Sequence, residues 1–265
     1  MKTDKHLPQV PRVAAASISA HLRAKARQAG LSLVELMVAV TIGLFLLLVV
    51  ANLFIGSKQT YTNQDNLSRL QENGRFAIAL MGKAVREAGF HYLSFNPQPN
   101  YYGVPTATSP AWPYTTVAVV GGTEGGTSPD TITLAEDNSV DCLNAAVTSP
   151  AQNQYSINAS AQLICTSLAN ASTTGVLLDG VEDMQVLYGE DLGSSYRYVP
   201  ANTAGVNWGN VNAVRICMLL RTTAGGLTVT AQHYTDCNGN TNVTATDGRI
   251  REAFSETFTI RSRIP

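Results

Sequence analysis

The most apolar stretch of the chain runs from Leu36 to Ile55, twenty residues without a charge or a proline. Twenty helical residues rise about 30 Å, the thickness of the hydrocarbon core of a bilayer. The run begins just after Glu35, and a polar, basic stretch that ends at Gly30 precedes it. The pattern therefore predicts a membrane-spanning helix near the N-terminus. Glu35 requires an explanation, because a charged side chain near the end of a membrane-spanning helix is costly to insert into the bilayer.

The helical pattern continues beyond the apolar run. From Leu67 to Ala88, apolar or small residues recur at spacings of three and four, and most charged residues fall on the opposite face. One helix from Leu31 to about Ala88 is therefore expected, and Gly89 is a suitable residue to end it. Three internal glycines weaken this helix and are candidate sites for a kink or a melted turn: Gly56, Gly74 and Gly82.

After Gly89 the pattern changes. Residues 90–129 are rich in Pro, Gly, Ser, Thr and Tyr, which is typical of loops with short strands between them. Later stretches mix β-branched and aromatic residues with alternation, as half-buried strands do. The expected strands are Asp130–Glu136, Gln162–Thr166, Gly175–Val181, Met184–Gly189, Val214–Thr222, Leu227–Tyr234 and Phe254–Arg263. The predicted fold class is α+β, with a long N-terminal helix, transmembrane in its first half, packed on a β-rich globular head.

Charge is distributed unevenly along the 265 residues. Residues 1–30 carry six Lys or Arg and one Asp, a net +5, and subtracting this from the whole-chain charge of −1 leaves −6 for the remainder. By the positive-inside rule, the basic segment stays in the cytoplasm and the remainder crosses the membrane. A region at −6 has no general attraction for nucleic acid, so no direct nucleic-acid partner is predicted.

The glycine, the acid five residues later and the apolar run together resemble the class III signal of type IV prepilins. The resemblance implies cleavage after Gly30 by a prepilin peptidase and N-methylation of Leu31, where the family usually has phenylalanine. Glu35 then lies one helical turn from the cationic Leu31 amine. Pairing of the two groups between subunits would set the axial register of a filament, a role that the family supports. The alternative is a solitary acid that extends to the cytoplasmic surface.

Three later blocks resemble PilW-like minor pilins: Gln71–Phe90, Gly180–Asp191 and Arg251–Arg263. Residues 96–171 match no block of that family. Together with the predicted membrane-spanning helix, which anchors the chain, these blocks imply a type IV pilin-like fold in four segments. Residues 1–30 form a cytoplasmic leader that is removed, and residues 31–56 a transmembrane and filament-core helix. Residues 57–89 continue as an amphipathic helix into the head, and residues 90–265 form a β-rich periplasmic or extracellular head.

The expected function is that of a non-enzymatic minor pilin in the initiation or tip complex of a type IV pilus. The protein would sit in the inner membrane, with the leader cytoplasmic and the head periplasmic, before it joins the pilus at the cell surface. The resemblance implies these partners: other minor and major pilins, the prepilin peptidase, the inner-membrane assembly platform with its extension ATPase, and membrane lipid. No cofactor is required. Two alternatives remain, a pseudopilin of a type II secretion system and a membrane-anchored periplasmic binding or adhesive domain that never polymerises.

Four cysteines follow the anchor: Cys142, Cys165, Cys217 and Cys237. None forms a CxxC pair, and an even number in an exported domain favours disulfides over buried free thiols. The sequence allows three pairings. Pairing of neighbours, Cys142 with Cys165 and Cys217 with Cys237, is preferred because it closes the shortest loops, each stabilising by about 3 kcal/mol.

Signals for catalysis or metal binding are poor. The region beyond the leader has only two histidines, His91 and His233, and none of the common hydrolase or nucleotide-binding motifs. An acidic set is more typical of a solvated loop face than of a glycosidase pair: Asp179, Glu182, Asp183, Glu190 and Asp191. Oxygen ligands alternate at Asp236, Asn238 and Asn240, a weak calcium candidate, but the bidentate acid that closes a calcium loop is missing. A polar turn beside Cys237 is the preferred interpretation.

Overall fold

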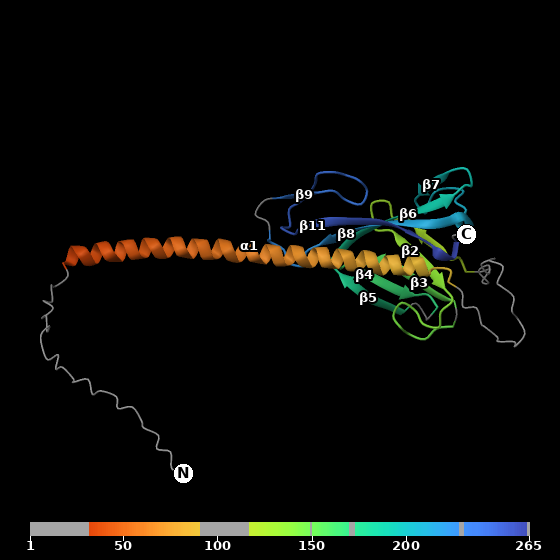
Figure 1. Ribbon diagram of the computed structural model, residues 1–265, viewed down its shortest axis with the longest axis horizontal. Coiled ribbons are helices and arrows are strands. Elements are labelled where there is room, and N and C mark those ends of the chain that lie inside the picture. Colours follow the sequence, from red (N-terminus) through yellow and green to blue (C-terminus); the bar gives the residue numbers. More distant parts are fainter. Residues whose placement is uncertain (1–31, 91–116, 149, 170–172, 228–230, 264–265) are drawn as a thin grey trace, which may run out of the picture. The chain divides into compact units, whose positions relative to one another are not determined.

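The computed structural model describes residues 32–90, 117–148, 150–169, 173–227 and 231–263. The chain divides into two compact units, Met1–Leu53 and Phe54–Pro265. Helix α1 (Leu33–Glu87) supplies residues to both. All the strands belong to the second unit. The long N-terminal helix and the β-rich head that the sequence predicts are therefore both present (Figure 1).

In the first unit, the described residues from Leu33 onward are helical, and all of them except Gly43 are exposed. Every large apolar side chain of α1 up to Leu53 is exposed, and the least exposed of them, Val49, still has 42% of its surface accessible. Among the described residues, α1 is the one helix that is long and apolar enough to cross a membrane. A continuous exposed apolar surface of this kind is typical of contact with a membrane or with another protein.

In the second unit, α1 packs its apolar face on the strands. The residues of α1 that are buried there include Leu70, Ala77, Met81 and Val85, as the three-and-four spacing predicts. The predicted melted turn does not occur, since the helix is continuous through its glycines. The helix ends at Glu87, and Gly89 follows it in the left-handed conformation with φ of 71°. Its role as the C-terminal stop is thus confirmed.

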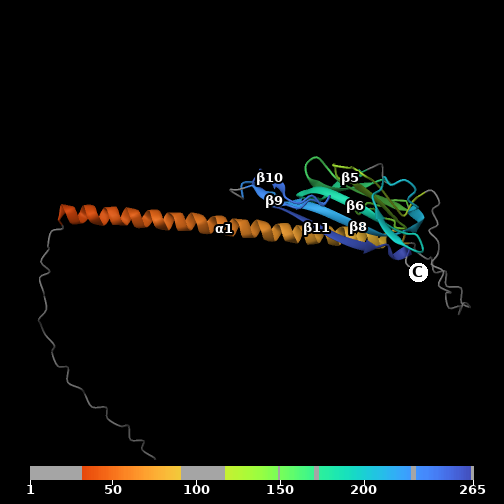
Figure 2. The same ribbon diagram turned by 90° about the horizontal axis from the view of Figure 1, so that it is seen from above.

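Two of the glycines have a packing role instead. An added Cβ at Gly74 would overlap the ring of Phe254, and one at Gly82 would overlap the ring of Phe258. Both rings come from strand β11 (Arg251–Thr259), which runs beside α1 in both views (Figures 1 and 2). Eight helical residues rise about 12 Å and four strand residues about 13 Å, so the two spacings match. The glycines form notches that receive successive aromatic rings.

The strands form two antiparallel sheets and one hairpin. The five-stranded sheet has the order β1-β2-β3-β4-β5, the four-stranded sheet β11-β8-β6-β7, and β9 pairs with β10. The first sheet comprises β1 (Val120–Thr123), β2 (Thr131–Glu136), β3 (Ala151–Ile157), β4 (Gln162–Ser167) and β5 (Thr173–Asp179). The remaining strands are β6 (Val181–Asp191), β7 (Tyr196–Val199), β8 (Val211–Arg221), β9 (Gln232–Tyr234) and β10 (Val243–Ala245).

Strand β6 joins the two sheets, because it pairs with β8 and also packs against β2, β3 and β4. The fully buried side chains come from both sheets and from α1, and include Met81, Ile132, Leu163, Tyr188 and Ile216. One hydrophobic core therefore holds the helix and both sheets of the second unit together. Two short 3-10 turns, η1 (Trp208–Asn210) and η2 (Arg261–Arg263), flank β8 and β11.

Both disulfides are formed with the pairing of neighbours. Cys142–Cys165 ties the loop after β2 to β4, and its Cα atoms are 6.5 Å apart. Cys217–Cys237 ties β8 to the turn after β9, with 5.6 Å between Cα atoms. Each bridge thus anchors an irregular segment to the middle of a sheet.

Candidate functional site

The residues predicted to matter most lie at the start of the chain. Gly30 and Leu31 lie outside the described residues. Glu35 is in the first turn of α1 and is exposed, and the first helical hydrogen bond runs from the Leu36 amide to the Ser32 carbonyl at 3.1 Å. A carboxylate there interacts favourably with the positive end of the helix dipole. The helix therefore presents one accessible negative charge beside an otherwise apolar surface.

The few polar side chains on that surface bond to the helix itself. Thr41 Oγ1 donates to the Val38 carbonyl at 2.9 Å, and Asn52 Nδ2 donates to the Leu48 carbonyl at 3.0 Å. In hydrocarbon, an unsatisfied polar group costs several kcal/mol, so such local bonds suit an apolar environment. Ala39 and Gly43 lie four residues apart, and an added Cβ at Gly43 would meet no atom within 4 Å. This spacing of small residues allows another helix to approach closely.

The acidic residues of the head occupy a strand and its flanks, which corrects the interpretation of them as a loop face. Glu182, Asp183, Glu190 and Asp191 all belong to β6, and Asp179 ends β5. Glu182 and Glu190 are eight residues apart, about 26 Å along a strand. A glycosidase needs its two carboxylates roughly 5–9.5 Å apart. These two acids therefore cannot act as such a pair.

Glu182 belongs to a charge cluster that the sequence pattern did not reveal. Its carboxylate accepts hydrogen bonds from Arg251 Nε at 2.6 Å and from Arg221 at 3.1 Å. Arg251 also pairs with Asp247 at 2.8 Å. The hydrogen bond from Arg251 holds the pKa of the Asp247 carboxyl well below its usual range. The cluster links β6, β8 and β11 to the segment before β11.

Glu190 was assigned to a solvated surface, but only 1% of it is exposed. It accepts a hydrogen bond from the Asn207 amide at 2.8 Å and two from the Arg197 guanidinium at 2.8 and 3.0 Å. The amide and then the guanidinium lower the pKa of the Glu190 carboxyl. A buried, fully bonded carboxylate of this kind serves to hold the β6–β7 hairpin and the η1 turn.

The weak calcium candidate, Asp236 to Asn240, is a turn whose residues hydrogen-bond to one another. Asp236 Oδ1 accepts from the amides of Asn238 and Asn240, at 3.0 and 2.8 Å, and Oδ2 accepts from Asn240 Nδ2. Both carboxylate oxygens of Asp236 thus accept hydrogen bonds from within the turn. Across the described ranges, no group of three His, Cys, Asp or Glu side chains is placed to hold a metal ion.

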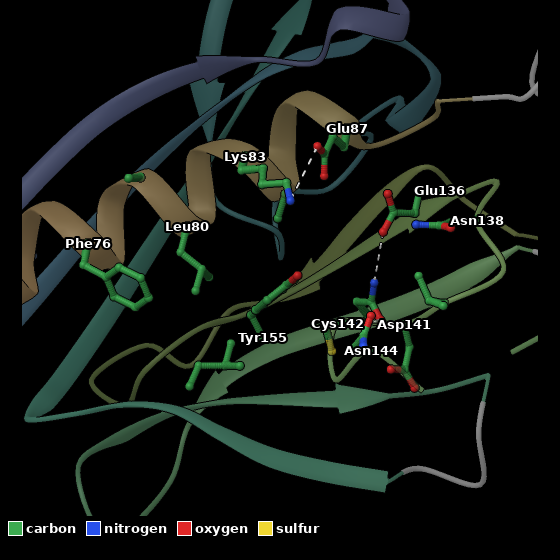
Figure 3. Close-up of a pocket in the computed structure, with 15 residues that line it drawn as sticks. Phe76, Leu80, Lys83, Glu87, Glu136, Asn138, Asp141, Cys142, Asn144 and Tyr155 are labelled. Carbon is green, nitrogen blue, oxygen red and sulfur yellow. Dashed lines mark hydrogen bonds and ion pairs between the residues drawn. The ribbon is translucent and has the colours of Figure 1, made fainter. Parts of the chain in front are cut away.

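A cavity of about 540 Å³ lies between α1 and the first sheet within the head (Figure 3). Lys83 pairs with Glu87 at 4.0 Å on the helix side, and Glu136 accepts from Asn153 at 3.5 Å on the sheet side. Burial, together with the Glu87 charge, raises the pKa of the Glu136 carboxyl. Burial also raises the pKa of the Tyr155 phenol. The described lining combines paired charges and amides with apolar side chains, and it contains no nucleophile activated by a neighbouring base.

Comparisons with known families decide what the N-terminal segment is. Residues 25–51 match the model of the prokaryotic N-terminal methylation motif, which covers the glycine, Glu35 and most of the apolar run. Residues 151–262 match the model of type IV pilus-assembly protein W, from β3 through β11. These matches support a type IV pilin that is PilW-like in its head.

Two further comparisons concern individual proteins. The structure of this PilW-like pilin is similar to that of a type IV-like pilin from Thermus thermophilus, with 12% sequence identity and a TM-score of 0.48. The likeness covers 73% of the PilW-like chain and 97% of the Thermus chain. No curated protein matches the sequence. The likeness to pilins supports a structural role with other pilus components as partners.

Proposed function

We propose that this PilW-like protein is a minor pilin that takes part in the initiation or tip complex of a type IV pilus. The observation that carries the proposal is the coincidence of the methylation motif with a helical segment whose apolar side chains are all exposed. A segment of that composition needs lipid or other helices around it. The pilus life cycle supplies both in turn, first the inner membrane and then the filament core.

In this proposal the four predicted segments have successive roles. The prepilin peptidase removes residues 1–30 on the cytoplasmic side, and Leu31 becomes the methylated N-terminus. Residues 31–56 span the inner membrane and later pack against the helices of other minor and major pilins. Residues 57–89 carry the head, which is periplasmic before assembly and exposed on the pilus afterwards. The inner-membrane assembly platform and its extension ATPase drive that transfer.

Glu35 has a specific role in this scheme. Its carboxylate stands in the first turn of α1, and Glu35 follows Leu31 by four residues in the sequence. Among apolar helices, where the effective dielectric is low, an unpaired charge is heavily disfavoured. Glu35 of one subunit therefore pairs with the Leu31 amine of another, and this pairing selects one axial register rather than adding much net stability.

The processing step is tested by mass spectrometry of the N-terminal peptide. Protein from the membrane fraction and from sheared pili should begin at methylated Leu31. A Gly30→Leu variant should keep the full leader and should be absent from sheared pili. Native protein that starts at Met1 and never co-purifies with pili would instead favour a simple membrane anchor.

The register role is tested with Glu35→Ala and Glu35→Gln. Both variants should insert and be cleaved normally, because the apolar run is intact, yet both should fall at least about tenfold in pilus incorporation. Glu72→Ala, which removes an exposed acid elsewhere on α1, is the matched control and should assemble normally. Wild-type incorporation of Glu35→Ala in a strain that carries only this variant would contradict the role.

A further inference from the structure

The two sheets have four edges, and three of them are protected against pairing with another chain. Strands β1 and β7 are only four residues long. Strand β5 is irregular, because the register shifts where it pairs with β4 near Leu163. Short and bulged edges are standard protections against unwanted strand addition. The fourth edge, β11, is nine residues long and keeps a continuous register with β8 from Arg251 to Thr259.

The hydrogen-bond pattern shows which β11 residues face away from β8. The Thr222 amide donates to the Ile250 carbonyl, and the Ile260 amide donates to the Asn212 carbonyl, so even-numbered residues bond to β8. The odd-numbered residues therefore point their backbone groups outward. Beyond Arg251, these groups have no hydrogen-bond partner within the ranges that the structure describes: Ala253, Ser255, Thr257 and Thr259.

One outward position is already paired in the way a strand would pair. The Arg251 amide donates to Gln232 Oε1 at 2.9 Å, and Gln232 Nε2 donates to the Arg251 carbonyl at 3.3 Å. A single side-chain amide thus makes the two-bond exchange of an antiparallel residue pair. It covers the first outward residue, and the next one, Ala253, is half-buried. Ser255, Thr257 and Thr259 are exposed and have side chains that strands tolerate or favour.

We propose that the β11 edge binds an extended segment of a neighbouring pilin subunit by strand addition, an inference that rests on the proposed function. Only an extended backbone offers donors and acceptors that repeat every two residues to match the outward groups. Consecutive outward residues on β11 are about 6.7 Å apart. The partner therefore contributes a strand of about seven residues opposite Ala253–Thr259.

The charges on the edge indicate the partner's side chains. Glu252 and Glu256 form no salt bridge with any residue that the structure describes. In the added pair, both occupy non-hydrogen-bonded positions, where opposed side chains come closest. The partner strand therefore carries Lys or Arg at two positions four residues apart. Two copies of β11 pairing antiparallel about Phe254 would instead place Glu252 opposite Glu256, which is repulsive.

Proline substitution tests the edge without breaking the sheet. In Thr257→Pro, the lost amide is one that points outward, so the β8 ladder is intact, as for prolines on natural edge strands. The matched control is Thr257→Val, which loses the same hydroxyl, an acceptor for Arg215 Nε, but keeps the amide. We expect both variants to be cleaved, with unfolding temperatures within a few degrees of each other. Pilus incorporation should fall at least about tenfold for Thr257→Pro only. Equal incorporation of the two variants would overturn the proposal.

Amide hydrogen exchange on the wild-type chain gives a readout that needs no variant. The amides of Ala253, Ser255, Thr257 and Thr259 should exchange rapidly in the detergent-solubilised subunit. They should slow at least about a hundredfold in its complex with other pilins. Wild-type protein that is present in pili with these amides still exchanging rapidly would overturn strand addition but not the minor-pilin function. Absence from pili altogether would count against that function. A dimer of the purified chain that Thr257→Pro abolishes would overturn the choice of a different subunit.

Discussion

The packing of α1 against β11 gives a stability prediction whose sign is not obvious from the sequence. Replacing Gly82 by Ala in the middle of a helix should gain about 1 kcal/mol from helix propensity. Gly82 is buried, however, and the new Cβ would overlap the ring of Phe258, which is 6% exposed. Overpacking of this kind costs about 1–3 kcal/mol. Steric overlap with a ring held in the core should outweigh the helix gain, so the substitution should destabilise the head by up to about 2 kcal/mol.

The assay is thermal unfolding of the full chain in detergent, followed by near-ultraviolet circular dichroism of the head. For a unit of about this size, 1 kcal/mol shifts the unfolding temperature by about 2–4 °C, so Gly82→Ala should lower it by up to about 8 °C. Gly56→Ala is the matched control, since an added Cβ there would meet no atom within 4 Å, and it should cause no loss.

A double-mutant cycle decides whether the ring is the cause. In a Phe258→Leu background, the smaller side chain leaves room for the new methyl group, so the cost of Gly82→Ala should shrink by about 1 kcal/mol or more. The reasoning is refuted if Gly82→Ala raises the unfolding temperature, or if its cost is the same in both backgrounds.

Three further predictions follow from the head. The Asn207 amide and Arg197 lower the pKa of Glu190, so its contribution to stability is complete above its unfolded pKa and is lost as the pH falls through the lower folded value. Glu190→Gln should therefore flatten the acid limb of a stability-versus-pH curve, and an unchanged limb would contradict this assignment. Replacing Cys217 and Cys237 together by Ser should destabilise the head by about 3 kcal/mol in urea unfolding, while a loss below about 0.5 kcal/mol would argue against loop closure as its cause. Arg251→Met should lower the unfolding temperature more than Arg261→Met. The Arg251 side chain is 8% exposed and pairs with two carboxylates, whereas Arg261 is exposed. Equal effects of the two substitutions would show that the charge cluster adds nothing to the stability of the head.

The helix and most strands could be predicted because their hydrophobic periods are strong. Strands β4, β6 and β8 lie where alternation predicts them, although β6 begins after a turn at Gly180 that the pattern merged with the preceding strand. The strand predicted over Phe254–Arg263 is β11, which spans Arg251–Thr259, and its predicted end is instead the 3-10 turn η2. Strand β3 was missed because its sequence is polar. Its buried face includes Asn153, whose side chain accepts a hydrogen bond from the Cys142 amide and so replaces an apolar contact.

Prediction of the site was uneven for a physical reason. The prepilin signal is local in sequence, so Gly30, Leu31 and Glu35 could be singled out, and their roles remain predictions. The burial of Glu190 depends on an arginine across a hairpin and an amide from a turn, and the Arg251 cluster joins residues up to 69 positions apart. Residue pairs that meet only in the tertiary structure give no periodic pattern in the amino-acid sequence. The notches at Gly74 and Gly82 were taken for weak points because their partners lie far along the chain.

The notches have a consequence for how the protein is made. Their rings belong to β11, which follows α1 by more than 150 residues, so α1 cannot pack fully until β11 has been synthesised. Contacts of such long sequence separation form late because their chain entropy must be lost first. A product truncated before Phe254 would leave the notched face of the helix uncovered. Only chains that include β11 would then form a fully packed head, which gives the cell a way to recognise and degrade copies that lack it before they reach a pilus.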